Sequence, residues 1–423
     1  QLRGGIGSFV GRPAYVWLAN AFQNSGASGV ALLTCRGAAA PAFTAANVAT
    51  PPTACANGTT ASAGSELNLL SEDLKFPQNL RTTFGYDRSL GSNYVATFEA
   101  LYTQGLNNPF YQNIALAGPL GTDRYGRVVY GDSANAPRLR VAGRTTVLDV
   151  TNQSKDYAVN LTAGVSRRFA DRYSGSLFYT FTRAREVQGL TSSTAFSQYR
   201  FGRATGGNQA SLDLTPGRFE TPHRIVAQGS YAFPTRTDLS FTYVGQSGAN
   251  YEYVVNGDAN GDGFTLNDPI YVPRNAYDTA QIRFSGSAQA VVEQQAAFER
   301  FVQSVPCLRE NRGRILGRNS CAAPWSNLVN LSLNQGLQTI GAQNLSLRVD
   351  VFNFLNLLNK EWGEQRTTGE IGPVSLLTLR SKTAGTFQGG ASQIYEFSRT
   401  ARRYTSSRLE SNYQVQAMVR YSF

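Results

Sequence analysis

Lysine, histidine and methionine are nearly missing from this chain of 423 residues. It has one His, one Met and four lysines, so arginine supplies almost all of the 39 basic side chains and the formal net charge of +11. Guanidinium groups bind phosphate and carboxylate through paired hydrogen bonds and stay charged when half-buried. The arginines are spread along the chain and are not clustered beside an aromatic RNA-binding signature. We therefore expect no nucleic-acid partner, while anionic lipid head groups and a charged barrel lumen stay open.

Long apolar runs and catalytic signatures are also missing. No stretch of about eighteen apolar residues occurs, which excludes a transmembrane helix but not a membrane β-barrel, whose lumen face is polar. We find no GxSxG, HExxH or phosphate-cradling loop. His223 has no identifiable nucleophile or carboxylate partner, so we interpret it as structural or interfacial. The sequence does not predict an enzyme.

The four cysteines are Cys35, Cys55, Cys307 and Cys321. Their spacing does not match CxxC, and the single histidine argues against a zinc site. Three disulfide connectivities are open, of which local pairing within each half is the simplest. We expect structural disulfides formed in an oxidising compartment.

Aromatic residues and glycine are abundant, with 24 Phe, 21 Tyr and 41 Gly. The last eleven residues, Tyr413 to Phe423, alternate between an apolar and a mostly polar face, as strand geometry requires. Similar alternation marks four hairpins, whose turns lie at Leu90 to Asn93, Ala170 to Tyr173, Pro234 to Thr237 and near Gly341 to Asn344.

Long connections separate these hairpins, at roughly 13–76, 107–144, 187–222, 248–324 and 352–412. Short turns at one end and long loops at the other are typical of an outer-membrane barrel. A sandwich or propeller does not segregate loop lengths in this way. Counting 1–10 as a strand gives about ten spanning strands, and we expect further strands before Gln1. One long loop is predicted to contain an amphipathic helix from Ser287 to Ser304.

Aromatic residues lie beside the short turns, where an interfacial girdle is expected; ordinary core aromatics are the alternative. The residues are Tyr86, Tyr94, Tyr173, Tyr231, Phe233, Tyr421 and Phe423.

Several stretches, in this order, resemble the Oar-like TonB-dependent receptors of Gram-negative outer membranes. They are Gly11 to Asn20, Asn256 to Arg274, Arg348 to Asn356 and the terminal Phe423. The resemblance runs over nearly the whole chain. It implies an all-β, antiparallel transmembrane barrel of 22 strands with long extracellular loops, plugged by an N-terminal domain that carries a TonB box. Residues 1–423 would then be the C-terminal portion of that barrel, and the plug, the first strands and the contact with TonB would lie outside this chain.

A calcium loop is the sharpest local motif. Asp258, Asn260 and Asp262 occupy positions 1, 3 and 5 of an EF-hand-type loop, Gly263 occupies position 6, and the carbonyl of Phe264 falls at position 7. Position 12 is Pro269, and Asp268, one place earlier, is the remaining residue of the predicted metal site. We predict a Ca²⁺ site here; the alternative is a solvated Asn/Asp/Gly turn.

A second group of candidate residues is basic. Arg402, Arg403 and Arg408 precede the final strand and are predicted to meet lipopolysaccharide phosphates, with a solvated charge run as the alternative.

Two functional hypotheses follow for an outer-membrane protein in contact with lipid and lipopolysaccharide. One is energised transport of an unidentified substrate by a TonB-dependent receptor. The other is a structural or adhesive barrel that displays its loops to extracellular partners. A secreted soluble β-protein is a third possibility.

Overall fold

The computed structural model describes residues 1–423 except for a set of short segments. These are 24–30, 43, 61, 64–65, 92, 132–136, 141, 143, 171, 191, 193, 203–207, 209, 338–342, 369–372, 383–392, 400, 402 and 423.

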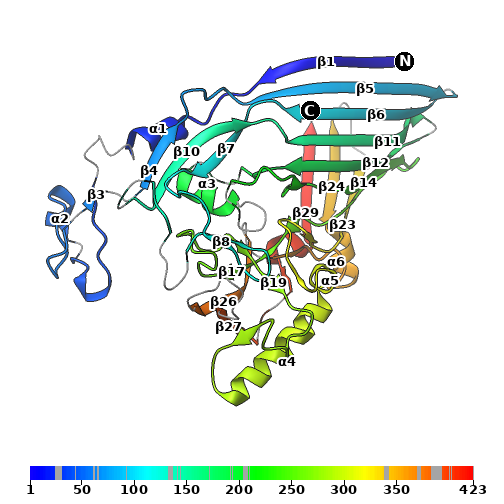
Figure 1. The fold of residues 1–423 in the computed structure, drawn as a ribbon. Coiled ribbons are helices and arrows are strands. Elements are labelled where there is room, and N and C mark those ends of the chain that lie inside the picture. Colours follow the sequence, from blue (N-terminus) through cyan, green and yellow to red (C-terminus); the bar gives the residue numbers. More distant parts are fainter. Residues whose placement is uncertain are drawn as a thin grey trace.

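One large antiparallel sheet organises the chain (Figure 1). Ten strands follow one another in this sheet, and each pairs with the next. The two-residue strand β13 (Thr215–Pro216) also pairs with the end of β12. The ten strands are β1 (Leu2–Val10), β5 (Gln78–Leu90), β6 (Tyr94–Gly105), β11 (Tyr157–Ala170), β12 (Tyr173–Glu186), β14 (His223–Ala232), β15 (Thr237–Gln246), β23 (Ser326–Leu337), β24 (Asn344–Phe352) and β29 (Gln414–Ser422). They include every strand that the alternating pattern predicts.

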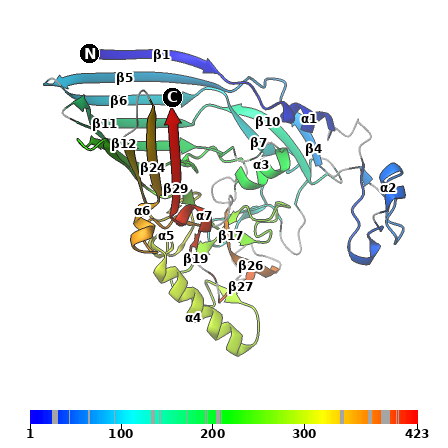
Figure 2. The ribbon, with the colours of Figure 1, turned by 180° about the vertical axis from the view of Figure 1, so that it is seen from behind.

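The sheet curls but does not close, because β1 and β29 do not pair with each other (Figures 1 and 2). Short turns join β5 to β6, β11 to β12 and β14 to β15 at one end. Backbone φ is +78° at Gly91 and +76° at Arg172, which are the left-handed conformations that tight turns need. The predicted turn between β23 and β24 includes Gly341, which lies outside the described residues.

The two faces of the sheet differ in chemistry. One face exposes large apolar side chains, among them Ile6, Phe98, Leu177, Phe241 and Val419. The opposite face carries polar pairs: Thr162 with Thr180 (3.0 Å), Ser174 with Ser230 (2.7 Å) and Arg348 with Asp350 (2.9 Å). The two hydroxyl pairs sit across neighbouring strands in the register of the sheet, so they help to fix that register, whereas Arg348 and Asp350 lie two residues apart on β24.

Five long loops leave the other end of the sheet, and we number them loops 1 to 5 in chain order. Loop 1 contains α1 (Tyr15–Gln23), β2 (Ala31–Leu32), η1 (Gly37–Ala39), α2 (Ala45–Ala49), β3 (Ser62–Ala63) and β4 (Glu66–Leu70). Loop 2 contains β7 (Asn108–Asn113), β8 (Gly121–Thr122), β9 (Val128–Val129) and β10 (Thr146–Gln153), and loop 3 contains α3 (Ala195–Gly202) and β13.

Loops 4 and 5 are richest in structure. Loop 4 contains β16 (Asn250–Tyr251), β17 (Tyr253–Asn256), β18 (Asp268–Pro269), β19 (Tyr271–Val272), β20 (Arg283–Phe284), α4 (Ala288–Ser304), α5 (Pro306–Glu310), β21 (Arg314–Ile315) and β22 (Cys321–Ala322). Loop 5 contains α6 (Phe354–Leu358), β25 (Arg366–Thr367), β26 (Val374–Lys382), β27 (Gln393–Phe397), β28 (Thr405–Ser406) and α7 (Arg408–Ser411). None of the helices in the described part of the chain has the length and hydropathy to span a bilayer.

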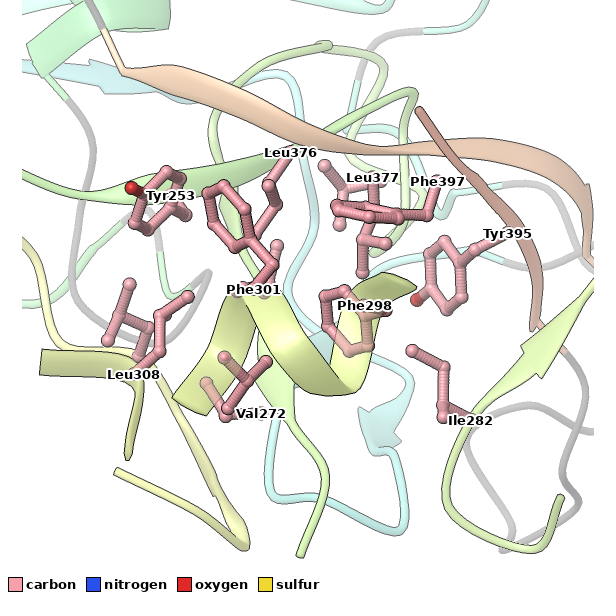
Figure 3. Close-up of a cluster of buried hydrophobic side chains, with 14 of the residues drawn as sticks. Tyr253, Val272, Ile282, Phe298, Phe301, Leu308, Leu376, Leu377, Tyr395 and Phe397 are labelled. Atoms are coloured by element: carbon pink, nitrogen blue, oxygen red, sulfur yellow. The ribbon is translucent and has the colours of Figure 1, made fainter. Parts of the chain in front are cut away.

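Loops 4 and 5 share a five-stranded sheet in the order β18-β17-β26-β27-β20. The predicted helix is α4; Ser287 is its N-cap and accepts a hydrogen bond from the backbone N–H of Ala290. Its apolar stripe covers this small sheet, and the rings of Phe298 and Phe301 meet Phe397 there (Figure 3). This is a hydrophobic core of its own, separate from the large sheet.

A second cluster joins four loops. Tyr111 and Leu148 come from loop 2, Tyr199 from loop 3 and Phe264 from loop 4, and all four are buried. Trp17, from loop 1, packs against them, with its ring centroid 6.2 Å from that of Tyr111. The two clusters together tie the five loops into one body, which we call the loop layer.

Candidate functional site

Both disulfides follow the local pairing. Cys35 is bonded to Cys55 in loop 1, and Cys307 is bonded to Cys321 in loop 4, with Cα–Cα distances of 5.6 and 5.2 Å. The second bridge joins α5 to β22 and borders the core around α4. Both lie in the loops and not in the strands of the large sheet.

The predicted calcium loop forms a compact turn around Asp258. Its carboxylate accepts hydrogen bonds from the backbone N–H groups of Gly261 (2.6 Å), Asp262 (3.1 Å) and Gly263 (3.0 Å). Gly261 and Gly263 have φ of +75° and +90°, a conformation that glycine adopts without strain. The chain therefore wraps the first predicted ligand in the way that positions 1 to 6 of a calcium loop require.

Asp262, which is buried, accepts hydrogen bonds from one backbone N–H and two side-chain amides. Asp262 Oδ1 accepts from the N–H of Phe264 (2.8 Å), and Oδ2 accepts from the side-chain amides of Asn267 (2.8 Å) and Asn260 (3.4 Å). Asn267 is only 1% exposed, and its Oδ1 has no hydrogen-bond partner within the described structure. Sequence reasoning did not select Asn267, because the motif places its last ligand at position 12 and Asn267 is at position 10.

Asp268 has contacts of a different kind. Its Oδ2 accepts from the N–H groups of Ala259 (2.7 Å) and Asn260 (3.3 Å), and its Oδ1 lies 3.2 Å from the guanidinium of Arg127 in loop 2. Burial raises the pKa of Asp268 above the usual aspartate range, and the charge of Arg127 opposes that rise. Arg127, also buried, donates to the carbonyl of Pro269 (2.6 Å) and lies 3.6 Å from Asp123.

The loop from Asp258 to Asp268 touches three other loops, so we call it the hub. Its Asn260 carbonyl accepts from the N–H of Tyr130 in loop 2 (2.7 Å), and its Ala259 carbonyl accepts from Gln393 in loop 5 (2.6 Å). From loop 3, Arg200 donates to the carbonyl of Thr265 (2.8 Å). A Cβ on Gly261 would come within 2.1 Å of the carbonyl oxygen of Gly131, so the hub and loop 2 approach as closely as glycine allows.

The ring of Phe264 reinforces this position. It lies 4.7 Å, centroid to centroid, from the ring of Tyr199 and 5.1 Å from that of Phe196, both in α3. The residue predicted to supply a backbone carbonyl thus also places its side chain in the four-loop cluster.

The oxygen set of the hub fits a hard cation such as Ca²⁺, which prefers carboxylate, amide and backbone carbonyl oxygens. Within the described residues, no group of three or more His, Cys, Asp or Glu side chains gathers closely enough to hold a metal ion, so a cation in the hub would need amide and backbone oxygens as well as carboxylates. Besides the carboxylate of Asp268, which faces Arg127, the hub holds the carboxylates of Asp258 and Asp262 and the side-chain amides of Asn260 and Asn267; the Asn267 oxygen is buried and has no hydrogen-bond partner in the described structure.

The three predicted lipopolysaccharide-binding arginines are not brought together by any described contact. Arg402 lies outside the described residues, and Arg408 begins the short helix α7. Arg403 is half-buried, donates to the carbonyl of Ser304 at the end of α4 (3.0 Å) and lies over the ring of Tyr404. Its described contacts belong to the loop layer, and a role with lipopolysaccharide stays a prediction.

Two other predicted features have structural contacts. His223 Nδ1 lies 2.7 Å from the hydroxyl of Tyr179 on the neighbouring strand, in keeping with an interfacial residue. In the Arg348 to Asn356 stretch, Asn353 follows β24 with φ of +50°, and its side chain donates to the carbonyls of Gly363 (3.0 Å) and Ser411 (2.8 Å). That stretch therefore anchors loop 5 to the sheet.

The aromatic residues beside the short turns are exposed on the apolar face, as a girdle requires; Phe423 lies outside the described residues. The exposed members are Tyr86, Tyr94, Tyr173, Tyr231, Phe233 and Tyr421.

The polar face of the sheet is hollowed in two places. A cavity of about 840 Å³ near the loops is lined by amides such as Gln246, Asn330 and Gln414, together with the apolar side chains of Val244, Leu328 and Phe352. A smaller one of about 290 Å³ lies toward the short turns, between residues such as Asp238 and Arg348. Amides, hydroxyls and paired charges make this face suited to polar solutes and water.

Comparison with known proteins agrees with this architecture. The model of the outer membrane beta barrel domain family matches residues 1–393, so the chain belongs to that family, and it lies in the outer membrane of a Gram-negative bacterium. Among solved structures, the outer membrane transporter YddB from Escherichia coli matches with 14% identity and a TM-score of 0.40, over 85% of this chain. The chain spans only 35% of that transporter. No curated protein matches the chain.

Proposed function

We propose that residues 1–423 form the C-terminal part of the barrel of an Oar-like TonB-dependent transporter. In this proposal the complete barrel has 22 strands and a plug that carries the TonB box, and it moves an unidentified substrate inward or outward with energy from TonB. We assign no catalytic step to it.

The observation that carries the proposal is the polar face of the curved sheet, with its hollow of about 840 Å³ beside the loop layer. The hollow is the part of this observation that favours transport, because a barrel that only displays loops also has a polar inner face. Hydroxyl pairs such as Ser174 with Ser230 and ion pairs such as Arg348 with Asp350 line this wall along several strands. A polar interior is what a solute pathway through a barrel requires.

The loop layer gives the alternative its specific support. It buries two hydrophobic cores and has two disulfides, which is more structure than a simple connection between strands needs. A rigid layer of this kind suits display to an extracellular partner, and a TonB-independent adhesive or structural barrel is therefore the second candidate.

The first test is the size of the native protein. We expect mass spectrometry and N-terminal sequencing of the outer-membrane protein to give a species much heavier than 45.9 kDa. On gels it should be heat-modifiable, as a closed barrel is.

The second test is binding of the intact protein to the periplasmic domain of TonB. Binding that is lost when the TonB-box segment is deleted supports transport. A mature protein close to 45.9 kDa with no TonB binding would overturn the proposal and favour display.

A further inference from the structure

We propose that the hub binds one Ca²⁺ ion and that this ion fixes the contacts of loop 4 with loops 2, 3 and 5. The ligands are the carboxylates of Asp258 and Asp262, the side-chain oxygens of Asn260 and Asn267, and the carbonyl of Phe264. Asp268 is a positioning residue. The inference does not depend on the transport function.

The main structural evidence for the site, beyond its sequence motif, is the environment of the Asn267 side chain. Its amide is buried, its nitrogen lies 2.8 Å from Asp262 Oδ2, and its oxygen has no hydrogen-bond partner in the described structure. The oxygen and nitrogen of an amide are told apart only by their hydrogen bonds. Turning this amide over brings its oxygen beside the Asp262 carboxylate, which is unfavourable unless a cation lies between the two oxygens.

The spacing suits calcium. Ligands at 2.3–2.6 Å from one Ca²⁺ ion lie at about the separation observed between the Asn267 amide and Asp262. The EF-hand-type loop places a bidentate acid at position 12, where this chain has Pro269. Asn267, at position 10, supplies the missing oxygen from inside the turn that Leu266 makes with φ of +65°.

The roles of the aspartates follow from their partners. Asp268 accepts the N–H groups of Ala259 and Asn260 and faces Arg127, so a guanidinium already balances its charge. Asp258 and Asp262 also accept hydrogen bonds at both oxygens, but they accept N–H groups from within the turn and stand at positions 1 and 5, where the motif places its ligands.

The position of the hub gives the ion its structural effect. Ala259 and Asn260 accept hydrogen bonds from loops 5 and 2 through their carbonyls, and Phe264 packs against α3 of loop 3. All three residues lie within the calcium loop. Fixing that loop with a cation therefore fixes its contacts with three other loops together.

Isothermal titration of CaCl₂ into the intact, detergent-purified protein tests the site. We expect about one Ca²⁺ site and much weaker binding of Mg²⁺, because that ion demands octahedral geometry at shorter distances. Asp262→Asn and Asn267→Leu should each weaken binding at least about tenfold, since each removes ligand charge or a ligand oxygen. Asp73→Asn, on an exposed turn of loop 1, is the matched control and should bind as the parent does.

Folding of each variant is verified by its intact Cys307–Cys321 disulfide and its heat-modifiable migration. No heat above that of buffer with the parent protein would overturn the site. Unchanged affinity in folded Asn267→Leu would overturn the assigned ligand set.

Hydrogen exchange with and without a chelator tests the structural effect. Removing Ca²⁺ should speed exchange in β7, α3 and β27 as well as in the hub, and the Asp262→Asn variant should exchange fast at all calcium concentrations. Faster exchange confined to residues 258–268 would contradict the proposed link between loops. Neither measurement involves TonB or a substrate, so its failure is distinct from failure of the transport proposal.

Discussion

The large sheet and the loop layer place aromatic side chains in opposite environments: the sheet exposes them, and the loop layer buries them. In the sheet, Phe241 is 44% exposed on the apolar face, whereas in the loop layer Phe298 is fully buried under α4. The difference follows from the solvent. The outer face of the sheet meets lipid, so its apolar side chains need no protein cover, while the loop layer meets water and has to build cores of its own.

The comparison also shows how each region is held together. The sheet depends on backbone pairing between neighbours in sequence, and its side chains add polar pairs on one face. The loop layer depends on contacts between segments that are far apart in sequence, such as Phe298 with Phe397. Single substitutions should therefore destabilise one region and leave the stability of the other unchanged.

The largest difference in stability between the two regions is expected from Phe298→Ala. Its ring packs against Phe284 and Phe397, so its loss leaves a cavity and should cost the loop layer about 3–5 kcal/mol. Phe241→Ala, the matched control on the lipid face, should leave the loop layer unchanged. Denaturant titration read by limited proteolysis of the loops measures the effect. An equal loss in both variants would contradict the separation.

The two disulfides should differ in which loops they stabilise. Cys307→Ser with Cys321→Ser removes a bridge beside the core around α4 and should destabilise loops 4 and 5 by about 3 kcal/mol. Cys35→Ser with Cys55→Ser should affect loop 1 alone. The same proteolysis measurement, mapped by mass spectrometry, tells which loops open. Opening of loop 4 in the Cys35/Cys55 variant would refute this division.

A charge on the sheet should act according to the face that carries it. Phe241→Arg places a guanidinium against lipid and should lower the stability of the refolded barrel by about 2 kcal/mol or more. Ser240→Arg, one residue earlier, points to the polar face and should cost much less. Urea titration in lipid vesicles compares them, and equal costs would show that the faces are wrongly assigned.

The smallest effect concerns pH. Partial burial alone would raise the pKa of Glu299, but hydrogen bonds from Arg312, Ala276 and Gln303 hold that pKa below its usual range. A depressed pKa in the folded state stabilises the fold above about pH 4.3, the ordinary glutamate value, and this contribution is lost as pH falls through the lower folded value.

We therefore expect the loop layer to lose at most about 1 kcal/mol on acidification below pH 4 through this residue, because solvent screens the partly exposed Glu299–Arg312 pair. Thermal melts of the parent and of Glu299→Gln across pH 3 to 7 measure it. If both lose stability equally over that range, Glu299 is not responsible.

The sheet was predictable because its signal is local. Alternation in Tyr157 to Val165 or Leu345 to Val351 predicts both a strand and which of its side chains share a face. The short turn beside each strand then predicts the neighbouring strand with which it pairs. The N-cap Ser287 and the stripe of α4 are local signals of the same kind.

The loop layer was not predictable beyond its disulfides and α4. The sequence motif selects Asp258 and Asp262, but Arg127 and Tyr199 reach the hub from more than sixty residues away, and no local pattern marks them. Asn267 was missed because the motif assigns no ligand to position 10. Asp268 was selected by proximity to position 12, whereas its partner Arg127 is visible only in three dimensions.

The strand order of the small sheet has a consequence for the sequence of folding events. β26, near the end of the chain, lies in its centre, with β17 of loop 4 on one side and β27 on the other. Loop 4 therefore cannot complete its sheet until residues 374–397 have been synthesised and delivered. Until then the core around α4 lacks Leu377 and Phe397, and the unfinished protein exposes apolar side chains of loop 4 to periplasmic chaperones and proteases. Truncation shortly before residue 374 should thus prevent loop 4 from folding, although loop 4 ends about fifty residues earlier.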